Sequence, residues 1–438
     1  MNAIEDIKSF RLACKQTGQA LSTEVLHHIT ININTETLER ELSKLHYLAS
    51  APKGSSLRPA IQGIRQVDIK SLSPAQNHKG EWIVIGGKDS AEDDDGDVDR
   101  TLEMSCHEVK LKKCLYNALS SLTTVRTIKC VILFTLFFHD ALIIDRWSPT
   151  SKDRKWAHTA VMDALKTLPN LQSLSVGWGY RIDLPFHFFT TLQHISVQCV
   201  DEGNTFENLI QMISQSPLLK SIDFTYAKNN SLPRNLYQLF ERYPEDGVPP
   251  LRLKHLSLAN CLIRLDDKTV MRHLRYLTSL SLKDYMDPLS RVPISETHNQ
   301  EIWRTVSNAG LRLEEITLYN TPSAFVEYLG SYSGLKKLII HPGRYKNGIA
   351  SDIAGKKFYE ALEKHASSIE ELDVDTYYEG LWCFGHHNKA LFSTLQNLRT
   401  LSVKVQSSDL VRKSEVGRTS RQDIIVSSLG PSRVYPLD

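Results

Sequence analysis

Residues 253–258 read Leu-Lys-His-Leu-Ser-Leu, and residues 277–282 read Leu-Thr-Ser-Leu-Ser-Leu. Both stretches have the form apolar-x-x-apolar-x-apolar, in which the second and third apolar residues are two positions apart. A spacing of two is the period of a β-strand with one buried face. The same form recurs along the chain, and the nine stretches are Leu171/Leu174/Val176, Leu192/Ile195/Val197, Leu219/Ile222/Phe224, Leu253/Leu256/Leu258, Leu277/Leu280/Leu282, Leu313/Ile316/Leu318, Leu335/Leu338/Ile340, Ile369/Leu372/Val374 and Leu398/Leu401/Val403.

Successive stretches, which we call rungs, begin 21 to 36 residues apart, enough for one strand and one return segment each. Two earlier rungs are Ile64/Val67/Ile69 and Val125/Ile128/Cys130, which brings the number to eleven. Most return segments have apolar residues at the i, i+3 and i+4 spacing of an amphipathic helix. Repetition at this period predicts an α/β leucine-rich-repeat solenoid, with a curved parallel sheet inside and helices outside.

The overall composition excludes several classes of protein. The 438 residues include 52 basic and 50 acidic side chains, so the net charge of +2 gives no global attraction to nucleic acid or to a membrane. Seven scattered cysteines without a C-x-x-C pair fit a reducing compartment. No signal-peptide pattern opens the chain, and the most apolar stretch, 130–138, is about half the ~18 residues that a membrane span needs. We expect a cytoplasmic or nuclear protein, monomeric by itself.

The sequence predicts three regions. Residues 1–50 are expected to form a helical cap, residues 51–411 the solenoid, and residues 412–438 a poorly ordered tail. Within the solenoid, residues 71–108 contain an acidic run from Asp89 to Asp99, which we interpret as a disordered insertion. A calcium loop with Gly96 at its sixth position would place Ala91 and Leu102 where carboxylates are required, so we predict no metal there.

No catalytic signature is present. The segment 330–334 has the glycine spacing of a nucleophile elbow, but its central residue is Tyr332. Cys383, His386 and His387 could ligate a metal, yet no second ligand pair at zinc-site spacing accompanies them. The sequence therefore predicts a protein that is not an enzyme and has no cofactor and no metal.

Side chains between the apolar positions of a rung face away from the buried side, and large aromatic residues recur just past the strands. Tyrosine and tryptophan at such a rim are favoured anchors of protein interfaces, although each could instead cap its own repeat. Acidic residues in the same rows argue against nucleic acid. The predicted protein-binding residues on the concave face and its rim are Trp178, Tyr180, Tyr226, Lys283, Tyr285, Tyr319, Lys337, His341, Asp373, Asp375 and Tyr377.

The N-terminal segment carries a second signal. Residues 6–15 read Asp-Ile-Lys-Ser-Phe-Arg-Leu-Ala-Cys-Lys, followed by Ala-Leu at 20–21 and His-Ile-Thr-Ile at 28–31. This stretch resembles the second half of an F-box, as found in fungal-type F-box/leucine-rich-repeat proteins. The aromatic residue usual after the Cys-Arg pair is replaced near Thr17, and the first half, with its Leu-Pro-x-Glu opening, is missing. The matching positions are Ile7, Phe10, Leu12, Cys14, Lys15, Leu21, Leu26 and Ile29.

The resemblance implies a substrate-recognition subunit of a Skp–cullin–F-box ubiquitin ligase, which holds a target protein near the transfer machinery. Residues Ile7, Phe10, Leu12, Cys14 and Leu21 would then dock to the Skp adaptor. Two interpretations of this segment stay open: a remnant F-box that only caps the solenoid, or an F-box whose start is lost from this chain. The alternative function is a stand-alone leucine-rich-repeat scaffold without ligase association.

Overall fold

The computed structural model describes the chain in thirteen ranges of residues. The described residues are 27–34, 36–50, 58–72, 97–132, 155–178, 188–200, 205–227, 236–245, 247–259, 268–283, 296–343, 345–377 and 379–406. They fall into two compact units, Met1–Leu219 (unit 1) and Lys220–Asp438 (unit 2), which we describe separately.

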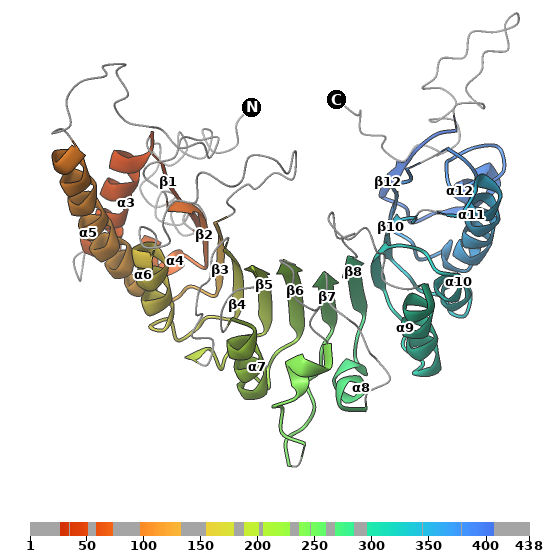
Figure 1. The fold of residues 1–438 in the computed structure, drawn as a ribbon, viewed down its shortest axis with the longest axis horizontal. Helices are drawn as coiled ribbons and strands as arrows, with labels where there is room; N and C mark the ends of the chain where they lie inside the picture. Colours follow the sequence, from red (N-terminus) through yellow and green to blue (C-terminus); the bar gives the residue numbers. More distant parts are fainter. Residues whose placement is uncertain are drawn as a thin grey trace, which may run out of the picture. The chain divides into compact units, whose positions relative to one another are not determined.

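Unit 1 alternates strands and helices. Its elements are β1 (His28–Ile33), α3 (Leu38–Ser50), α4 (Arg58–Gly63), β2 (Gln66–Leu72), α5 (Asp97–Ser121), β3 (Thr127–Ile132), α6 (Lys155–Leu165), β4 (Ser173–Trp178), β5 (His194–Val200) and α7 (Thr205–Gln215). Strands β1 to β5 pair in chain order, and every pair is parallel. The return helices lie on one side of the strand layer (Figure 1).

Unit 2 continues the same alternation with shorter return segments. Its elements are β6 (Ser221–Ala227), η2 (Leu236–Phe240), β7 (His255–Ala259), α8 (Lys268–Leu274), β8 (Ser279–Lys283), α9 (Glu296–Asn308), β9 (Glu315–Tyr319), α10 (Ser323–Leu329), β10 (Lys337–His341), α11 (Gly348–Leu362), η3 (Glu363–His365), β11 (Glu371–Val374), α12 (Lys389–Thr394) and β12 (Thr400–Val403). Strands β6 to β12 also pair in chain order and in parallel.

In every rung predicted from the sequence, the second and third apolar residues lie in a strand and the first comes just before it, and within each unit neighbouring rungs are in register. In unit 2, Leu338 is paired with Ile316 on one side and Leu372 on the other, and all three side chains are buried. The return helices cover this apolar layer with residues such as Trp303 and Phe325, whose ring centroids are 4.7 Å apart. Burial of a leucine or isoleucine contributes roughly 1.5–3 kcal/mol, so the aligned rungs are the main source of stability.

The predicted fold class is confirmed: each unit is a parallel α/β repeat array of the leucine-rich solenoid kind. Two boundaries differ from the prediction. Residues His28–Ile33 form β1, so the strand layer begins inside the segment predicted as a helical cap, because the alternation of Ile29, Ile31 and Ile33 suits a strand. The helix α5 begins at Asp97, so the last residues of the predicted acidic insertion are helical. Residues 73–96 and 407–438 lie outside the described residues.

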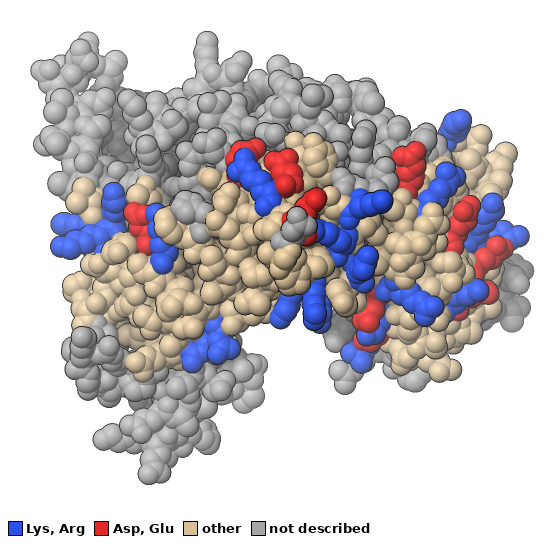
Figure 2. Space-filling model, turned by 90° about the horizontal axis from the view of Figure 1, so that it is seen from below, with Lys and Arg blue, Asp and Glu red and all other residues tan. Residues whose placement is uncertain are grey.

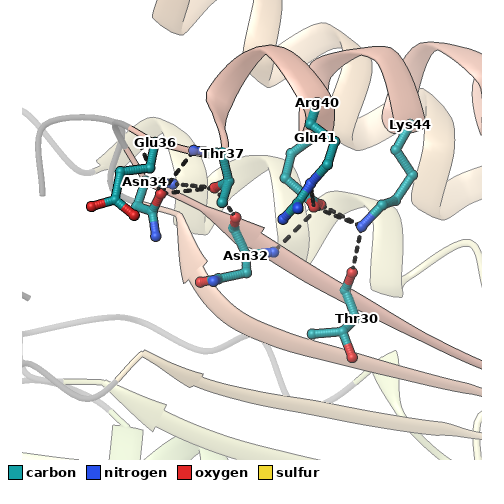
Figure 3. A network of polar contacts seen from close by, with 8 residues as sticks. All are labelled: Thr30, Asn32, Asn34, Glu36, Thr37, Arg40, Glu41 and Lys44. Carbon is teal, nitrogen blue, oxygen red and sulfur yellow. Dashed lines mark hydrogen bonds and ion pairs between the residues drawn. The ribbon is translucent and has the colours of Figure 1, made fainter. Parts of the chain in front are cut away.

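Side chains from α3 bind the backbone of β1 on the side away from β2. The carbonyl of His27 accepts from the backbone N–H groups of Arg65 and Gln66. The backbone N–H and C=O groups of odd-numbered residues in β1 therefore point towards β2, and those of even-numbered residues point away from it. On that far side the Lys44 ammonium donates to the Thr30 carbonyl at 2.9 Å, and the Asn32 N–H donates to the Glu41 carboxylate at 3.5 Å (Figure 3).

The Glu41 carboxylate is the charged centre of this network. The side chain of Glu41 is almost fully buried, and Lys44 donates to both of its oxygens at 2.7 Å. Beside it, the Asn34 side chain accepts from the backbone N–H groups of Glu36 and Thr37 and so shapes the turn into α3 (Figure 3). The carboxylate and ammonium occupy edge positions that another strand would otherwise use, a device that protects sheet edges from association.

We expect Lys44→Met to destabilise unit 1 more than the double variant Lys44→Met/Glu41→Gln. The single change leaves the buried Glu41 carboxylate with only the exposed Arg40 guanidinium, 3.6 Å away, which costs roughly 1–3 kcal/mol, and the second change removes that charge. Urea unfolding followed by circular dichroism measures both, with Lys112→Met on the exposed face of α5 as the control. Equal losses in the single and double variants would show that the Glu41 charge is not stabilised by Lys44.

Two buried histidines in unit 2 bind backbone groups of the preceding repeat. The Nδ1 atom of His273, at the end of α8, accepts the Leu251 N–H at 2.9 Å. The Nδ1 atom of His365, at the end of η3, accepts the Leu335 N–H at 3.1 Å, while its Nε2 lies 2.9 Å from the Leu329 carbonyl. Both rings are fully buried. These contacts require a neutral ring, because a protonated Nδ1 cannot accept.

The surroundings of both rings favour that neutral form. Burial, with a smaller contribution from the Arg272 guanidinium, lowers the pKa of His273 from 6.5 to about 4. Burial also lowers the pKa of His365, against a smaller opposing effect of its hydrogen bond to the Leu329 carbonyl.

We predict that unit 2 loses stability as the pH falls from about 6.5 towards 4. In this window the imidazole of His273 binds a proton in the unfolded chain but stays neutral in the folded one. The free energy of unfolding therefore decreases on acidification. The variant His273→Leu should be less stable at pH 7.5 by about 1–3 kcal/mol, because the Leu251 N–H loses its acceptor. Its stability should nevertheless vary less with pH. Urea titrations from pH 7.5 to 4 test this; an unchanged pH dependence would contradict it.

Candidate functional site

The candidate site lies on the face of the unit 2 strand layer opposite the return helices. Strand register aligns the outward side chains of β6–β12 into three rows. The row at the strand starts is Ser221, His255, Ser279, Glu315, Lys337, Glu371 and Thr400. The middle row is Asp223, Ser257, Ser281, Thr317, Ile339, Asp373 and Ser402. The row at the strand ends is Thr225, Ala259, Lys283, Tyr319, His341, Asp375 and Lys404.

Four side chains of the third row form what we call the strand-end cluster: Tyr319, His341, Asp375 and Lys404. The rings of Tyr319 and His341 stack with their centroids 4.1 Å apart. The Nδ1 atom of His341 lies 3.3 Å from one oxygen of Asp375, and the Lys404 ammonium lies 2.9 Å from the other. Lys404 also donates to the Thr376 carbonyl. The cluster therefore presents an aromatic surface, an imidazole and an ion pair side by side.

The carboxylate of Asp375 is ionised at neutral pH. The hydrogen bond from Lys404, supported by its charge and by His341, holds the pKa of Asp375 below its usual value, against a smaller effect of burial. About half of each partner side chain in the Asp375–Lys404 pair is exposed, so the pair orders the cluster more than it stabilises the fold.

The loops that follow β9 and β10 fix the position of the two rings. Asn320, directly after Tyr319, has a φ of 96°, a left-handed conformation that asparagine tolerates, and its N–H donates to the His341 carbonyl at 3.0 Å. Its side-chain oxygen would lie only 1.6 Å from a Cβ atom at position 343, so a residue larger than Gly343 would displace it. Next to it, the Thr321 and Tyr345 hydroxyls are 2.7 Å apart.

The other two rows contain further polar contacts and two unsatisfied atoms. Lys337 pairs with Glu371 at 2.8 Å, and the ring of His255 lies 2.8 Å from the Ser279 hydroxyl. In the middle row, one carboxylate oxygen of Asp373 and the hydroxyl of Ser281 are buried and have no hydrogen-bond partner. Buried polar atoms in folded proteins are rarely left unpaired. Neither atom has exposed surface, so a bound partner would reach it only after a movement of the side chain.

The structure brings together only some of the predicted binding residues. Tyr319, His341 and Asp375 are in contact, Lys337 and Asp373 lie in adjacent rows, and Lys283 ends β8 in the same row. Tyr377, just after β11, has 71% of its surface exposed. Trp178 ends β4 in unit 1, and Tyr226 lies in β6. Tyr180, Tyr285 and the adaptor-docking residues Ile7, Phe10, Leu12, Cys14 and Leu21 lie outside the described residues.

Lys404 is the member of the cluster that the predicted binding residues omit. It occupies the same position in its repeat as Tyr319, His341 and Asp375, two residues after Ser402. Strand register alone would therefore have found it. The predicted binding residues left it out because nothing in the sequence indicates the ion pair that it forms with Asp375 of the neighbouring repeat.

The residues considered for chemistry have structural contacts. The Tyr332 hydroxyl donates to the Leu313 carbonyl at 2.9 Å, and burial raises the pKa of Tyr332. Cys383 is buried, and the Nε2 atom of His387 lies 3.0 Å from the Leu381 carbonyl. Within the described ranges, no group of three or more His, Cys, Asp or Glu side chains is arranged to hold a metal ion. No helix in that part of the chain has the length and apolarity needed to cross a membrane.

Comparison with known proteins gives no further guide. No family model matches the chain, and no curated protein sequence matches it.

Proposed function

We propose that this chain is a protein-interaction module that binds its partner through the strand-end cluster and the adjacent rows of unit 2, and that it carries out no bond chemistry itself. The observation that carries the proposal is the ordered contact of Tyr319, His341, Asp375 and Lys404 on the face that the return helices leave open. Aromatic side chains beside paired charges are typical of interface anchors.

The polar side chains at the strand starts support the same proposal. Lys337 and Glu371, each about one-third exposed, pair at 2.8 Å and would fix the position of a partner segment lying across the strands by polar contacts. A surface of this kind recognises a protein of complementary shape and mixed charge.

Selection of peptides from a displayed random library on the intact chain tests the proposal. We expect enriched peptides to lose at least about tenfold in affinity for Tyr319→Ala/Asp375→Ala, because this variant removes the aromatic anchor and the carboxylate that orders Lys404. Affinities are measured by biolayer interferometry, with circular dichroism to show that the variant is folded.

The matched control is Ile349→Ala/Glu360→Ala on the exposed side of α11, which should bind the same peptides as the unchanged chain. If peptides bind both variants equally, or if none is enriched on the unchanged chain, the cluster is not a protein-binding surface.

We further propose, from the F-box resemblance alone, that the chain recognises substrates for a Skp–cullin–F-box ligase; the alternative is a scaffold without ligase association. A pulldown with purified Skp adaptor distinguishes them, using the full chain and a variant that lacks residues 1–26. The deletion ends at residue 26 because β1 begins at His28. Adaptor binding that disappears with the deletion favours the ligase function. Absence of binding by the folded full chain leaves the scaffold.

A further inference from the structure

A second polar surface lies at the opposite ends of the strands, where β7, β8 and β9 begin. Arg252, Tyr276 and Arg312 each directly precede the first apolar residue of a rung, so they occupy equivalent positions in three consecutive repeats. All three side chains are exposed, with 53% of the Tyr276 surface accessible. The Arg252 guanidinium lies 5.5 Å from the centroid of the Tyr276 ring, a cation–π distance.

Two further cations extend this surface. Lys254 is exposed at the start of β7, where its carbonyl accepts from Thr278 at 2.9 Å, and Arg275 is exposed beside Tyr276. We call Arg252, Lys254, Arg275, Tyr276 and Arg312 the basic edge. Figure 2 views the molecule from below, the side at which β6–β8 begin in Figure 1, and shows Lys and Arg side chains near the middle of the view with some Asp and Glu side chains beside them.

The basic edge differs from the continuation of the same edge at β9–β12. There, Lys336 pairs with Glu314 at 2.8 Å, and Arg399 pairs with Glu370 at 3.3 Å. In contrast, the structure gives Lys254, Arg275 and Arg312 no ion pair with any described carboxylate. Like charges on neighbouring positions repel one another, and an anionic partner would relieve that repulsion.

We infer that the basic edge binds an acidic segment of a partner protein. Neighbouring strands are about 4.8 Å apart, so Arg252 and Arg312 begin roughly 10 Å apart, a span of about three to four extended residues. Arginine side chains bind carboxylates in a bidentate fashion, and Tyr276 supplies an aromatic surface between them. This surface is separate from the strand-end cluster, so the inference does not rest on the proposed function.

The charges that flank the basic edge favour a short acidic peptide over a nucleic acid. A nucleic acid would follow the edge with a continuous line of phosphates, and beyond Arg312 it would meet the carboxylate of Glu370. An acidic peptide of a few residues ends before it reaches Glu370, and Glu314, beside Arg312, is already paired with Lys336.

Fluorescence anisotropy with a labelled peptide of about four Asp and Glu residues, the length that spans Arg252 to Arg312, tests the inference. We expect saturable binding to the full chain that weakens as NaCl is raised, because exposed charges are screened. Reversal of two cations in Lys254→Glu/Arg275→Glu should raise the Kd at least about tenfold. Arg312→Glu provides a second variant if the first does not fold.

The matched control Lys356→Glu/Lys357→Glu makes the same charge change on the exposed side of α11, and it should alter the Kd by less than about twofold. Three results would overturn the inference: no saturable binding at low salt, an equal loss in the control variant, or tighter binding of a single-stranded oligonucleotide of the same charge. The last result would assign the edge to nucleic acid. The variant Tyr319→Ala/Asp375→Ala should bind the acidic peptide normally, which separates this test from that of the proposed function.

Discussion

The rest of the structure depends on the register in which apolar rungs of neighbouring strands face one another. Leu338 meets Ile316 and Leu372, while the next residue, Ile339, is paired with Thr317 and Asp373 on the opposite face. A slip of β11 by one residue would bury Asp373 and expose Leu372, so the register is strongly specified wherever the helices cover one face. The same register also determines which polar side chains lie next to one another on the other face. The candidate site and the core therefore depend on the same strand pairing.

Burial of the rungs also buries backbone groups at the segments that enter each strand, and these need partners from outside the sheet. His273 and His365 bind the N–H groups of Leu251 and Leu335, while the Tyr328 hydroxyl accepts from the N–H of Leu313. An unpaired buried N–H costs roughly 1–3 kcal/mol, so each of these side chains contributes to the stability of the fold about as much as a buried leucine does. The buried histidines are therefore not candidates for a functional role, unlike His341, which lies on the open face.

The sequence alone predicted the parallel layer because the rung pattern is local: three apolar residues within six positions identify each strand. It also predicted Tyr319, His341 and Asp375 as neighbours of a binding surface, since alternation along a strand fixes their face. It did not predict that Lys404 pairs with Asp375 or that the Asn320 N–H donates to the His341 carbonyl, because these contacts depend on the distance between side chains or loops of neighbouring repeats, which the spacing of apolar residues does not give. The strand β1 was missed because its three isoleucines lack the leading apolar residue of a full rung.

The two ends of the unit 2 strands differ in how far their charges are already paired. In the strand-end cluster, Asp375 is bound by Lys404 and lies beside His341, so a partner would gain little net charge attraction there and would be recognised by shape and by the Tyr319 ring. At the basic edge the charges are not neutralised by described carboxylates and act at longer range, within about a Debye length of 8–10 Å. Unpaired surface charges mainly raise association rates, whereas an ordered, partly buried cluster mainly slows dissociation. A single partner that used both ends would therefore be attracted by one and retained by the other.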